Sequence, residues 1–267
     1  MLARVYFVRH GETDYNLAWR VQGQVDIPLN ATGRAQAERV GARLAREIAP
    51  GSLRVVASSP LVRAVDTADA VLRAYEAANA NANANAAPVV RCTREGFTEL
   101  SFGDLEGTVL RDVDEPPGNR ARYAEFRRVA ALWNADDLDY AVPHGESPRT
   151  VRARATAALA DVLGMLPAAT GDAADADAVP PAVVVVAHGR LLRTLIAGLL
   201  HVSCGTVSLG NTAVSRLDWH GGDAFTAVYI ADCSHAQELV QPTFHSILQK
   251  LQQEEDEKEK EKEEKEK

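Results

Sequence analysis

An uninterrupted run of four valines, residues 183–186, constrains the fold of this chain more than any other feature. A run that is apolar at every position is typical of a strand buried on both faces of a parallel sheet. Five further β-branched runs have a similar character, and segments with helical periodicity lie between them. Strands that alternate with helices predict an α/β fold with a mostly parallel sheet. The predicted strands are residues 3–8, 54–57, 89–92, 182–187, 213–219 and 225–231.

Four segments have apolar residues at helical spacing and are predicted to be helices: residues 32–48, 61–78, 147–166 and 191–200. The third begins with Ser147 and Pro148, which is typical of an N-cap residue followed by proline in the first turn. No element is assigned to residues 108–144.

The chain has 267 residues, 46% of them hydrophobic, which allows one large domain or two small ones. We predict a single domain over residues 1–250. Two alanine-rich, low-complexity segments near residues 78–87 and 167–181 offer no core face, so we expect them to be surface insertions. The tail, residues 251–267, is highly charged without an apolar stripe, and we expect it to be disordered or a solvated helix.

Charge and cysteine content exclude several classes of protein. The formal net charge is −8, and nine acidic residues and five lysines in residues 254–267 account for half of it. A mildly acidic body argues against a nucleic-acid partner. No apolar stretch approaches the roughly 20 residues of a membrane span, and the early first strand leaves no room for a signal peptide. Cys92, Cys204 and Cys233 fit neither a zinc pattern nor a disulfide framework, which favours a cytoplasmic protein.

Charged side chains follow four of the predicted strands. The first strand leads into Arg9 and His10, the second is followed by Arg63, the third leads on to Glu99, and the valine run ends at His188. Ligands of open α/β sheets bind outside the carboxyl ends of the strands, so parallel strands would gather these groups at one edge. A single His-Gly pair after a strand is more often a simple turn. Two such pairs, with two arginines and a glutamate, favour a binding site.

Two arginines and two histidines predict a small cationic pocket suited to a phosphoryl group. Arginine presents a planar fork that matches phosphate oxygens, and positioned donors do most of the work in phosphoryl transfer. No P-loop and no acidic metal cluster occurs, so we predict no metal or cofactor and a side chain as nucleophile. A histidine can serve if it is unprotonated, and nearby arginines lower the pKa of a histidine below about 6.5. A glutamate can protonate the leaving alcohol.

Five segments, in order along the chain, resemble the motifs of the histidine phosphatase superfamily, which has the phosphoglycerate mutase-like fold. They cover roughly residues 3–220. The segments are "VRHGETDYN" (residues 8–16), "SSPLVRAVDTA" (58–68), "FTELSFGDLEG" (97–107), "HGESPRTVRAR" (144–154) and "VVVVAHGRLLRTL" (183–195). One departure is His144, at a position where this family usually has glycine.

The resemblance implies a three-layer α/β/α fold and a phosphohistidine at His10. It implies that Arg9, Arg63 and His188 hold the phosphoryl group and that Glu99 is the proton donor. Asn16, Gln22, Gly23 and Gly189 would line the phosphate and substrate side, although Asn16 and Gln22 also fit ordinary surface positions.

The family contains phosphatases and mutases that share the phosphohistidine. Residues 20–37, "RVQGQVDIPLNATGRAQA", resemble the broad-specificity phosphatase branch, and the segment after Gly107 is short for a mutase lid. We therefore predict a phosphomonoester phosphatase of a small phosphorylated metabolite, such as a sugar phosphate or fructose-2,6-bisphosphate, with specificity set in residues 108–144. The alternatives are a mutase that interconverts 3- and 2-phosphoglycerate and a non-catalytic phosphate-binding module. The oligomeric state is left open.

Overall fold

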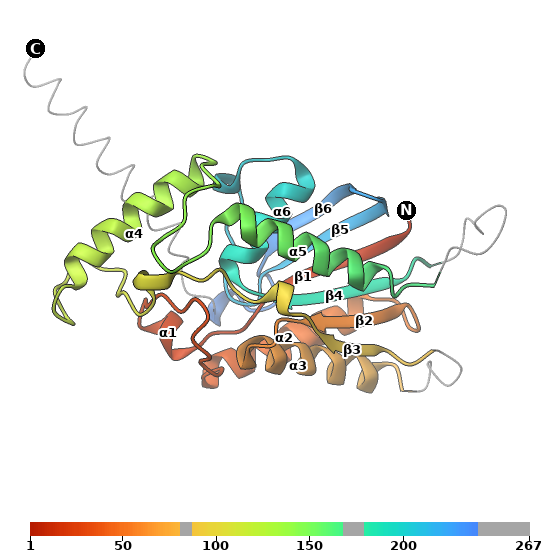
Figure 1. The fold of residues 1–267 in the computed structure, drawn as a ribbon. Coiled ribbons are helices and arrows are strands. Elements are labelled where there is room, and N and C mark those ends of the chain that lie inside the picture. The colour runs from red at the N-terminus through yellow and green to blue at the C-terminus, as the bar shows by residue number, and fades with distance from the viewer. Residues whose placement is uncertain (81–86, 168–178, 240–267) are drawn as a thin grey trace, which may run out of the picture.

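A computed structural model describes residues 1–80, 87–167 and 179–239. Six strands within them form one mixed sheet in the order β3-β2-β4-β1-β5-β6 (Figure 1). The four strands from β3 to β1 are parallel, as the apolar runs predict. The strands are β1 (Ala3–Arg9), β2 (Leu53–Ser58), β3 (Val90–Thr93), β4 (Ala182–Ala187), β5 (Val214–Gly221) and β6 (Ala224–Asp232).

The prediction of parallel strands over residues 213–219 and 225–231 is wrong in orientation. Both segments are strands, but β5 runs antiparallel to β1 and β6 antiparallel to β5. The pairing of β6 with β5 follows from the short connection between these two strands, which includes Gly221 and Gly222 at φ values of 109° and 51°. So short a turn joins antiparallel strands only, because a parallel pair needs a long crossover. β6 is an edge strand, and much of it is exposed.

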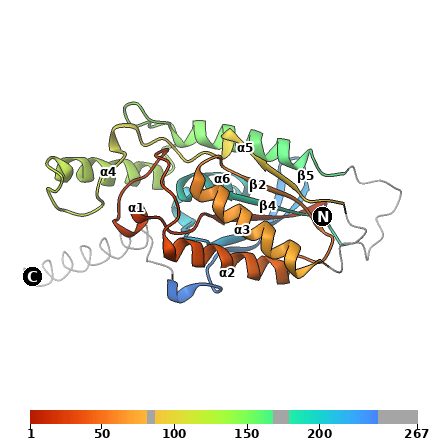
Figure 2. The same ribbon diagram turned by 90° about the horizontal axis from the view of Figure 1, so that it is seen from below.

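Helices cover both faces of the sheet, as Figures 1 and 2 show. Side chains of β1 alternate between the two faces, so Val5 and Phe7 join one hydrophobic core while Tyr6 and Val8 join the other. The first core packs against α4 (Asn119–Asn134), α5 (Pro148–Leu163) and α6 (Gly189–Leu200), and the second against α2 (Ala31–Glu47) and α3 (Val62–Ala78). These are the three layers of an α/β/α fold.

The start of α5 confirms the predicted cap. The Ser147 hydroxyl accepts the backbone N–H of Thr150 at 3.2 Å, and Pro148 occupies the first turn, where no N–H is needed. The start of α6 lies two residues before the predicted one, so that Gly189 and Arg190 belong to its first turn.

The helix α4 is absent from the sequence-based assignment. Tyr123, Phe126, Val129, Ala130 and Trp133 form its buried stripe at helical spacing, between arginines that face outward. Figures 1 and 2 both place α4 at the same end of the molecule as the short helix α1 (Asp14–Leu17). Residues 108–144 therefore supply a helix over the edge where the charged residues lie.

Several predictions lie wholly or partly outside the described residues. They are the predictions for the two low-complexity segments, whose central parts are residues 81–86 and 168–178, and for the tail, residues 251–267. Among the helices of residues 1–80, 87–167 and 179–239, none is both long enough and apolar enough to cross a membrane.

Candidate active site

The sheet register brings the two histidines together. Arg9 at the end of β1 lies beside Ala187 at the end of β4, so His10 and His188 follow neighbouring strands. The backbone N–H of His10 donates to the Ala187 carbonyl at 3.0 Å. The two imidazole rings are buried, with centroids 5.2 Å apart and planes inclined by 58°.

The His10 ring has its tautomer set by the backbone. Nδ1 lies 2.7 Å from the carbonyl oxygen of Gly11, and because a carbonyl only accepts, Nδ1 carries the proton and donates it. Burial, followed by the charges of Arg63 and Arg9, lowers the pKa of His10 well below 6.5. Nε2 is therefore unprotonated at neutral pH and has a free lone pair.

The loop that carries His10 is fixed from three sides. The His10 carbonyl accepts the backbone N–H of Thr212 at 3.3 Å and the side-chain amide of Asn211 at 3.2 Å. The Gly11 N–H donates to the Thr67 hydroxyl on α3 at 3.1 Å. A β-carbon at Gly11 would lie only 3.1 Å from the α-carbon of Gly33 on α2, so this close approach requires glycine.

The two predicted arginines lie near the two histidines, and each keeps an N–H donor that no described residue uses. Arg63 on α3 is buried and donates to the carbonyls of Val25 and Gly23 at 2.8 and 2.9 Å, and Arg9 donates to the Leu209 carbonyl at 2.7 Å. Burial lowers the pKa of both, that of Arg63 to about 10. Within the described part of the chain, the buried Nε of each has no hydrogen-bond partner. These unused donors fit an anion.

His188 is buried beside His10 and also has unused nitrogens. Neither ring nitrogen of His188 has a hydrogen-bond partner among the described residues. Burial, followed by the charge of Arg63, lowers the pKa of His188 well below 6.5. A neutral imidazole here can donate one N–H to an anion.

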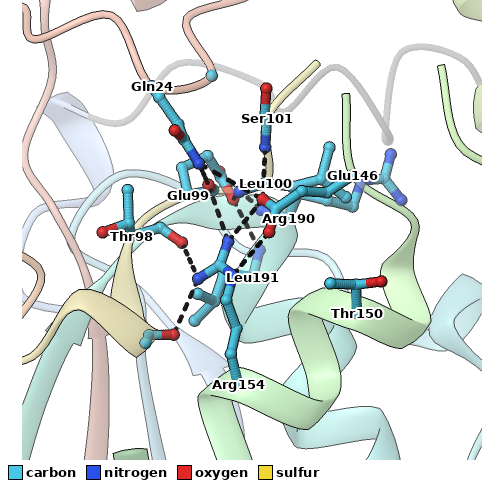
Figure 3. Close-up of polar contacts among 12 residues, drawn as sticks. Gln24, Thr98, Glu99, Leu100, Ser101, Glu146, Thr150, Arg154, Arg190 and Leu191 are labelled. Carbon is cyan, nitrogen blue, oxygen red and sulfur yellow. Dashed lines mark hydrogen bonds and ion pairs between the residues drawn. The ribbon is translucent and has the colours of Figure 1, made fainter. Parts of the chain in front are cut away.

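Glu99 lies against the first turn of α6, beside Arg190 and Leu191 (Figure 3). Its Oε1 accepts the backbone N–H groups of Leu100 and Leu191 at 2.8 and 2.9 Å, and its Oε2 accepts that of Arg190 at 3.1 Å. The side chain is 8% exposed. The unsatisfied N–H groups at the start of α6 thus orient this carboxylate.

A pocket of about 200 Å³ opens over these residues. Every predicted site residue except His188 lines it, and the ring of His188 is buried next to that of His10. Asn16 contacts Asn211 at 3.2 Å, and Gly23 has a φ of 54° that favours glycine. The predicted lining residues are Arg9, His10, Asn16, Gln22, Gly23, Arg63, Glu99 and Gly189.

The sequence analysis missed part of the wall. Arg190, Arg193 and Arg20 add positive charge, and Phe126, Ala130 and Asn134 reach the pocket from α4. Arg190 follows the His188-Gly189 pair directly, so its place in the first turn of α6 was available as a signal. His144, in contrast, is exposed and does not line the pocket; its φ of 59° explains why glycine is usual there.

No group of three or more histidine, cysteine, aspartate or glutamate side chains within residues 1–80, 87–167 and 179–239 is arranged to hold a metal ion. The positive charge of the pocket comes from arginine side chains.

Comparisons with known proteins agree with this geometry. A glucosyl-3-phosphoglycerate phosphatase of Mycobacterium tuberculosis is 30% identical over 233 residues, 84% of this chain and 90% of the relative. The phosphoglycerate mutase-like protein 4 of Arabidopsis thaliana is 29% identical over 237 residues, 88% of each chain. The solved structure of the mycobacterial glucosyl-3-phosphoglycerate phosphatase with VO3 is 28% identical, with a TM-score of 0.64, and covers 85% of this chain and 98% of that one.

The fold is accordingly that of the phosphoglycerate mutase-like histidine phosphatases, as the sequence predicts. The family model of the histidine phosphatase superfamily (branch 1) matches residues 5–232. This chain belongs to the histidine phosphatase superfamily, branch 1.

Proposed function

We propose that this protein is a phosphomonoester phosphatase that acts on a small phosphorylated metabolite through a phosphohistidine at His10. The observation that carries the proposal is the state of the His10 ring. Its Nδ1 proton is held by the Gly11 carbonyl, its pKa is low, and its Nε2 is free beside unused donors of Arg9 and Arg63. An unprotonated imidazole in a cationic pocket has the properties of a phosphoryl acceptor.

In the first step, Nε2 of His10 attacks phosphorus. A P–N bond forms while the bond from phosphorus to the substrate oxygen breaks, and Arg9, Arg63 and His188 stabilise the charge on the phosphoryl oxygens. The departing oxygen takes a proton from Glu99 and leaves as an alcohol. Oε1 of Glu99 accepts two N–H groups and Oε2 only one, so Oε2 is the oxygen with room for this proton.

In the second step, water attacks the phosphohistidine. The Glu99 carboxylate accepts a proton from the water, the P–N bond breaks, and phosphate leaves with His10 restored. A mutase differs only in the acceptor, since a second alcohol takes the place of water. Relatives are named for both activities, among them a probable phosphoglycerate mutase of an Enterobacter strain that is 31% identical over 222 residues. The mycobacterial phosphatase, 30% identical over 233 residues, favours hydrolysis.

The test compares phosphate release with isomer formation on 3-phosphoglycerate, 2,3-bisphosphoglycerate, fructose-2,6-bisphosphate and p-nitrophenyl phosphate. Phosphate release without isomerisation supports the phosphatase, and isomerisation that outruns release supports the mutase. Binding of vanadate or phosphate without turnover of any substrate would favour the non-catalytic module.

The remaining predictions complete the proposal. We propose one catalytic domain over residues 1–250, without a metal or cofactor, and with no nucleic-acid or membrane partner. The cytoplasm stays the proposed location, since Cys92, Cys204 and Cys233 are free thiols, as is usual in a reducing compartment.

A further inference from the structure

Glu99 lies in a segment with little regular secondary structure. Between β3 and α4 the described chain has only two short 3₁₀ helices, Glu95–Phe97 and Gly103–Leu105. No sheet ladder or α-helix fixes the backbone on either side of Glu99. An irregular segment that must place a proton donor within hydrogen-bond reach of a leaving group needs support from rigid elements.

Arg154 on α5 supplies that support with its whole side chain (Figure 3). Its Nη1 donates to the carbonyls of Gly96 and Thr98 at 2.9 and 2.6 Å, and its Nη2 donates to the carbonyl of Glu99 at 3.1 Å. The two remaining N–H groups, on Nε and Nη2, donate to the carboxylate of Glu146 at 2.9 Å each. All five donors of the guanidinium are therefore used, three on the Glu99 segment and two on Glu146.

Glu146 extends the same support to the residues that follow Glu99. Besides its bidentate pair with Arg154, its Oε2 accepts the backbone N–H of Ser101 at 3.0 Å. Gln24 contacts both residues, since its side-chain Nε2 lies 3.1 Å from the carbonyl oxygen of Glu99 and 3.4 Å from Oε2 of Glu146. Arg154 and Glu146 are both mostly buried, with 23% and 22% of their side chains exposed, so solvent screens the pair less than a surface pair.

The segment packs too closely on α5 for the contact to be incidental. A β-carbon on Gly96 would lie 2.6 Å from the β-carbon of Ala158 and 2.6 Å from the Arg154 carbonyl. The backbone of Glu99 is thus fixed to α5, while its carboxylate is fixed to the first turn of α6. The helices α5 and α6 pack against each other, so the backbone and the carboxylate of Glu99 are held by two helices that are in contact.

We propose that Arg154 and Glu146 are positioning residues that set the geometry of proton donation by Glu99; this inference rests on the proposed function. Neither residue lines the pocket, so neither touches the substrate. Their hydrogen bonds reach the site through the backbone of the Glu99 segment. A displaced Glu99 would impair the step in which the leaving oxygen takes its proton, and it would also slow the later attack of water, in which Glu99 is the base; a shift of about 1 Å can cost about 100-fold in rate.

The test measures kcat/KM, which includes phosphorylation of His10 and departure of the leaving group but not the later attack of water. It is measured on p-nitrophenyl phosphate, whose leaving group needs no proton, and on an alkyl phosphate, whose leaving group does. For Arg154→Lys and Glu146→Gln we expect a loss of about 10-fold or more on the alkyl phosphate and little change on p-nitrophenyl phosphate, because general acid catalysis contributes about 10² to 10⁴. Arg149→Lys is the matched control. Arg149 lies on the same helix and pairs with the exposed Asp139, and its replacement should leave both rates unchanged.

A double-mutant cycle separates positioning from general damage. In a Glu99→Gln background, Arg154→Lys should add no further loss on the alkyl phosphate, because the donor is already absent. Phosphorylation of His10 by p-nitrophenyl phosphate should persist in the Arg154→Lys and Glu146→Gln variants, and this reports an intact fold. Glu146→Gln keeps the proposal testable if Arg154→Lys does not fold.

Equal losses on both substrates, or additive losses in the double variant, would overturn this inference and leave the phosphatase proposal intact. A wild-type protein that releases phosphate from neither substrate would overturn the proposed function and this inference together.

Discussion

Gly11 and Gly33 lie in direct backbone contact, one after the nucleophile candidate and the other in the first turn of α2. A β-carbon on Gly33 would lie 2.7 Å from the backbone nitrogen of Glu12, inside any allowed contact distance. The same Glu12 N–H donates to the side chain of Gln36 on α2 at 2.8 Å. The position of the His10 loop is therefore set by how closely α2 can approach it.

The first prediction follows from this contact. Gly33→Ala should lower the free energy of unfolding by about 1–3 kcal/mol, because overpacking forces backbone shifts. It should also lower kcat, since the shift moves the His10 loop. Chemical denaturation and phosphate release measure the two effects. Gly164→Ala is the control, because Gly164 has helical dihedral angles and a β-carbon there meets atoms at an ordinary 3.4 Å; equal effects of both variants would contradict the prediction.

The second prediction concerns His10. His10→Ala should abolish covalent phosphorylation, because His10 is the proposed nucleophile and the neighbouring imidazole, that of His188, is assigned to hold the phosphoryl oxygens. Mass spectrometry after acid-free quenching detects the added phosphoryl group. His220→Ala, which removes an exposed imidazole bonded to Thr226, should label normally. Labelling that persists in His10→Ala would show that the nucleophile is another residue.

The third prediction concerns Glu99. Glu99→Gln keeps the shape of the side chain, and its amide oxygen can still accept the N–H groups of Leu100 and Leu191. Its NH2 group can neither accept the Arg190 N–H nor act as the proton donor. The kcat/KM of this variant, which excludes the later attack of water, should fall by about 10² or more on alkyl phosphates and much less on p-nitrophenyl phosphate. The slope of log kcat/KM against the pKa of the leaving group should become steeper than in the wild type. A parallel shift of the whole line would argue against Glu99 as the proton donor.

The fourth prediction links Arg63 to the pH dependence of activity. His10 reacts only when its Nε2 is unprotonated, and its pKa lies well below 6.5 because of burial and the charges of Arg63 and Arg9. The acidic limb of kcat/KM should therefore fall below pH 6.5 in the wild type. Arg63→Gln removes one of these charges, so the limb should move to higher pH while the maximum falls through loss of a phosphate donor. An unmoved limb would mean that another group sets it.

The fifth prediction concerns stability at low pH. His235 is partly buried beside Arg43, accepts or donates at the Thr212 hydroxyl, and has its pKa lowered to about 4 mainly by burial. The unfolded chain binds a proton at this residue near pH 6.5, whereas the folded chain binds it only near pH 4. The stability this group contributes is thus complete above pH 6.5 and is lost as the pH falls toward 4.

His235→Gln should consequently lose less stability than the wild type between pH 6.5 and pH 4, as denaturation at each pH measures. Asp232, Arg39 and Arg43 also face this ring, and Asp232 acts in the opposite direction to both arginines. Identical slopes in the variant and the wild type would refute the assignment.

The sequence predicts the parallel half of the sheet well because burial on both faces leaves a direct trace in it. β4 is predicted to the residue, and β1 and β2 to within one residue at either end. The apolar pattern does not show whether two neighbouring strands run parallel or antiparallel. The apolar residues of β5 fit a parallel or an antiparallel neighbour equally, and only the Gly221-Gly222 turn distinguishes them. The helix α4 was missed although its apolar spacing is regular.

The candidate site divides in the same way. His10, Arg63, Glu99 and His188 are predictable because each follows a strand end, and parallel strands bring such ends together. The role inferred for Arg154 is not predictable in this manner. Three of its five hydrogen bonds go to backbone carbonyls more than fifty residues away, and a carbonyl has no residue-specific signature in a sequence.

The alternation of side chains along β1 divides the interior into two cores with different consequences. Leu100 and Leu191, whose backbone N–H groups bind the proton donor Glu99, belong to the core on the side of α5 and α6. Val40, Leu44 and Val71 belong to the other core, on the side of α2 and α3. Substitutions in the second core could therefore change the thermal stability without changing the preference for one leaving group over another. Substitutions of the same kind in the first core would change both properties.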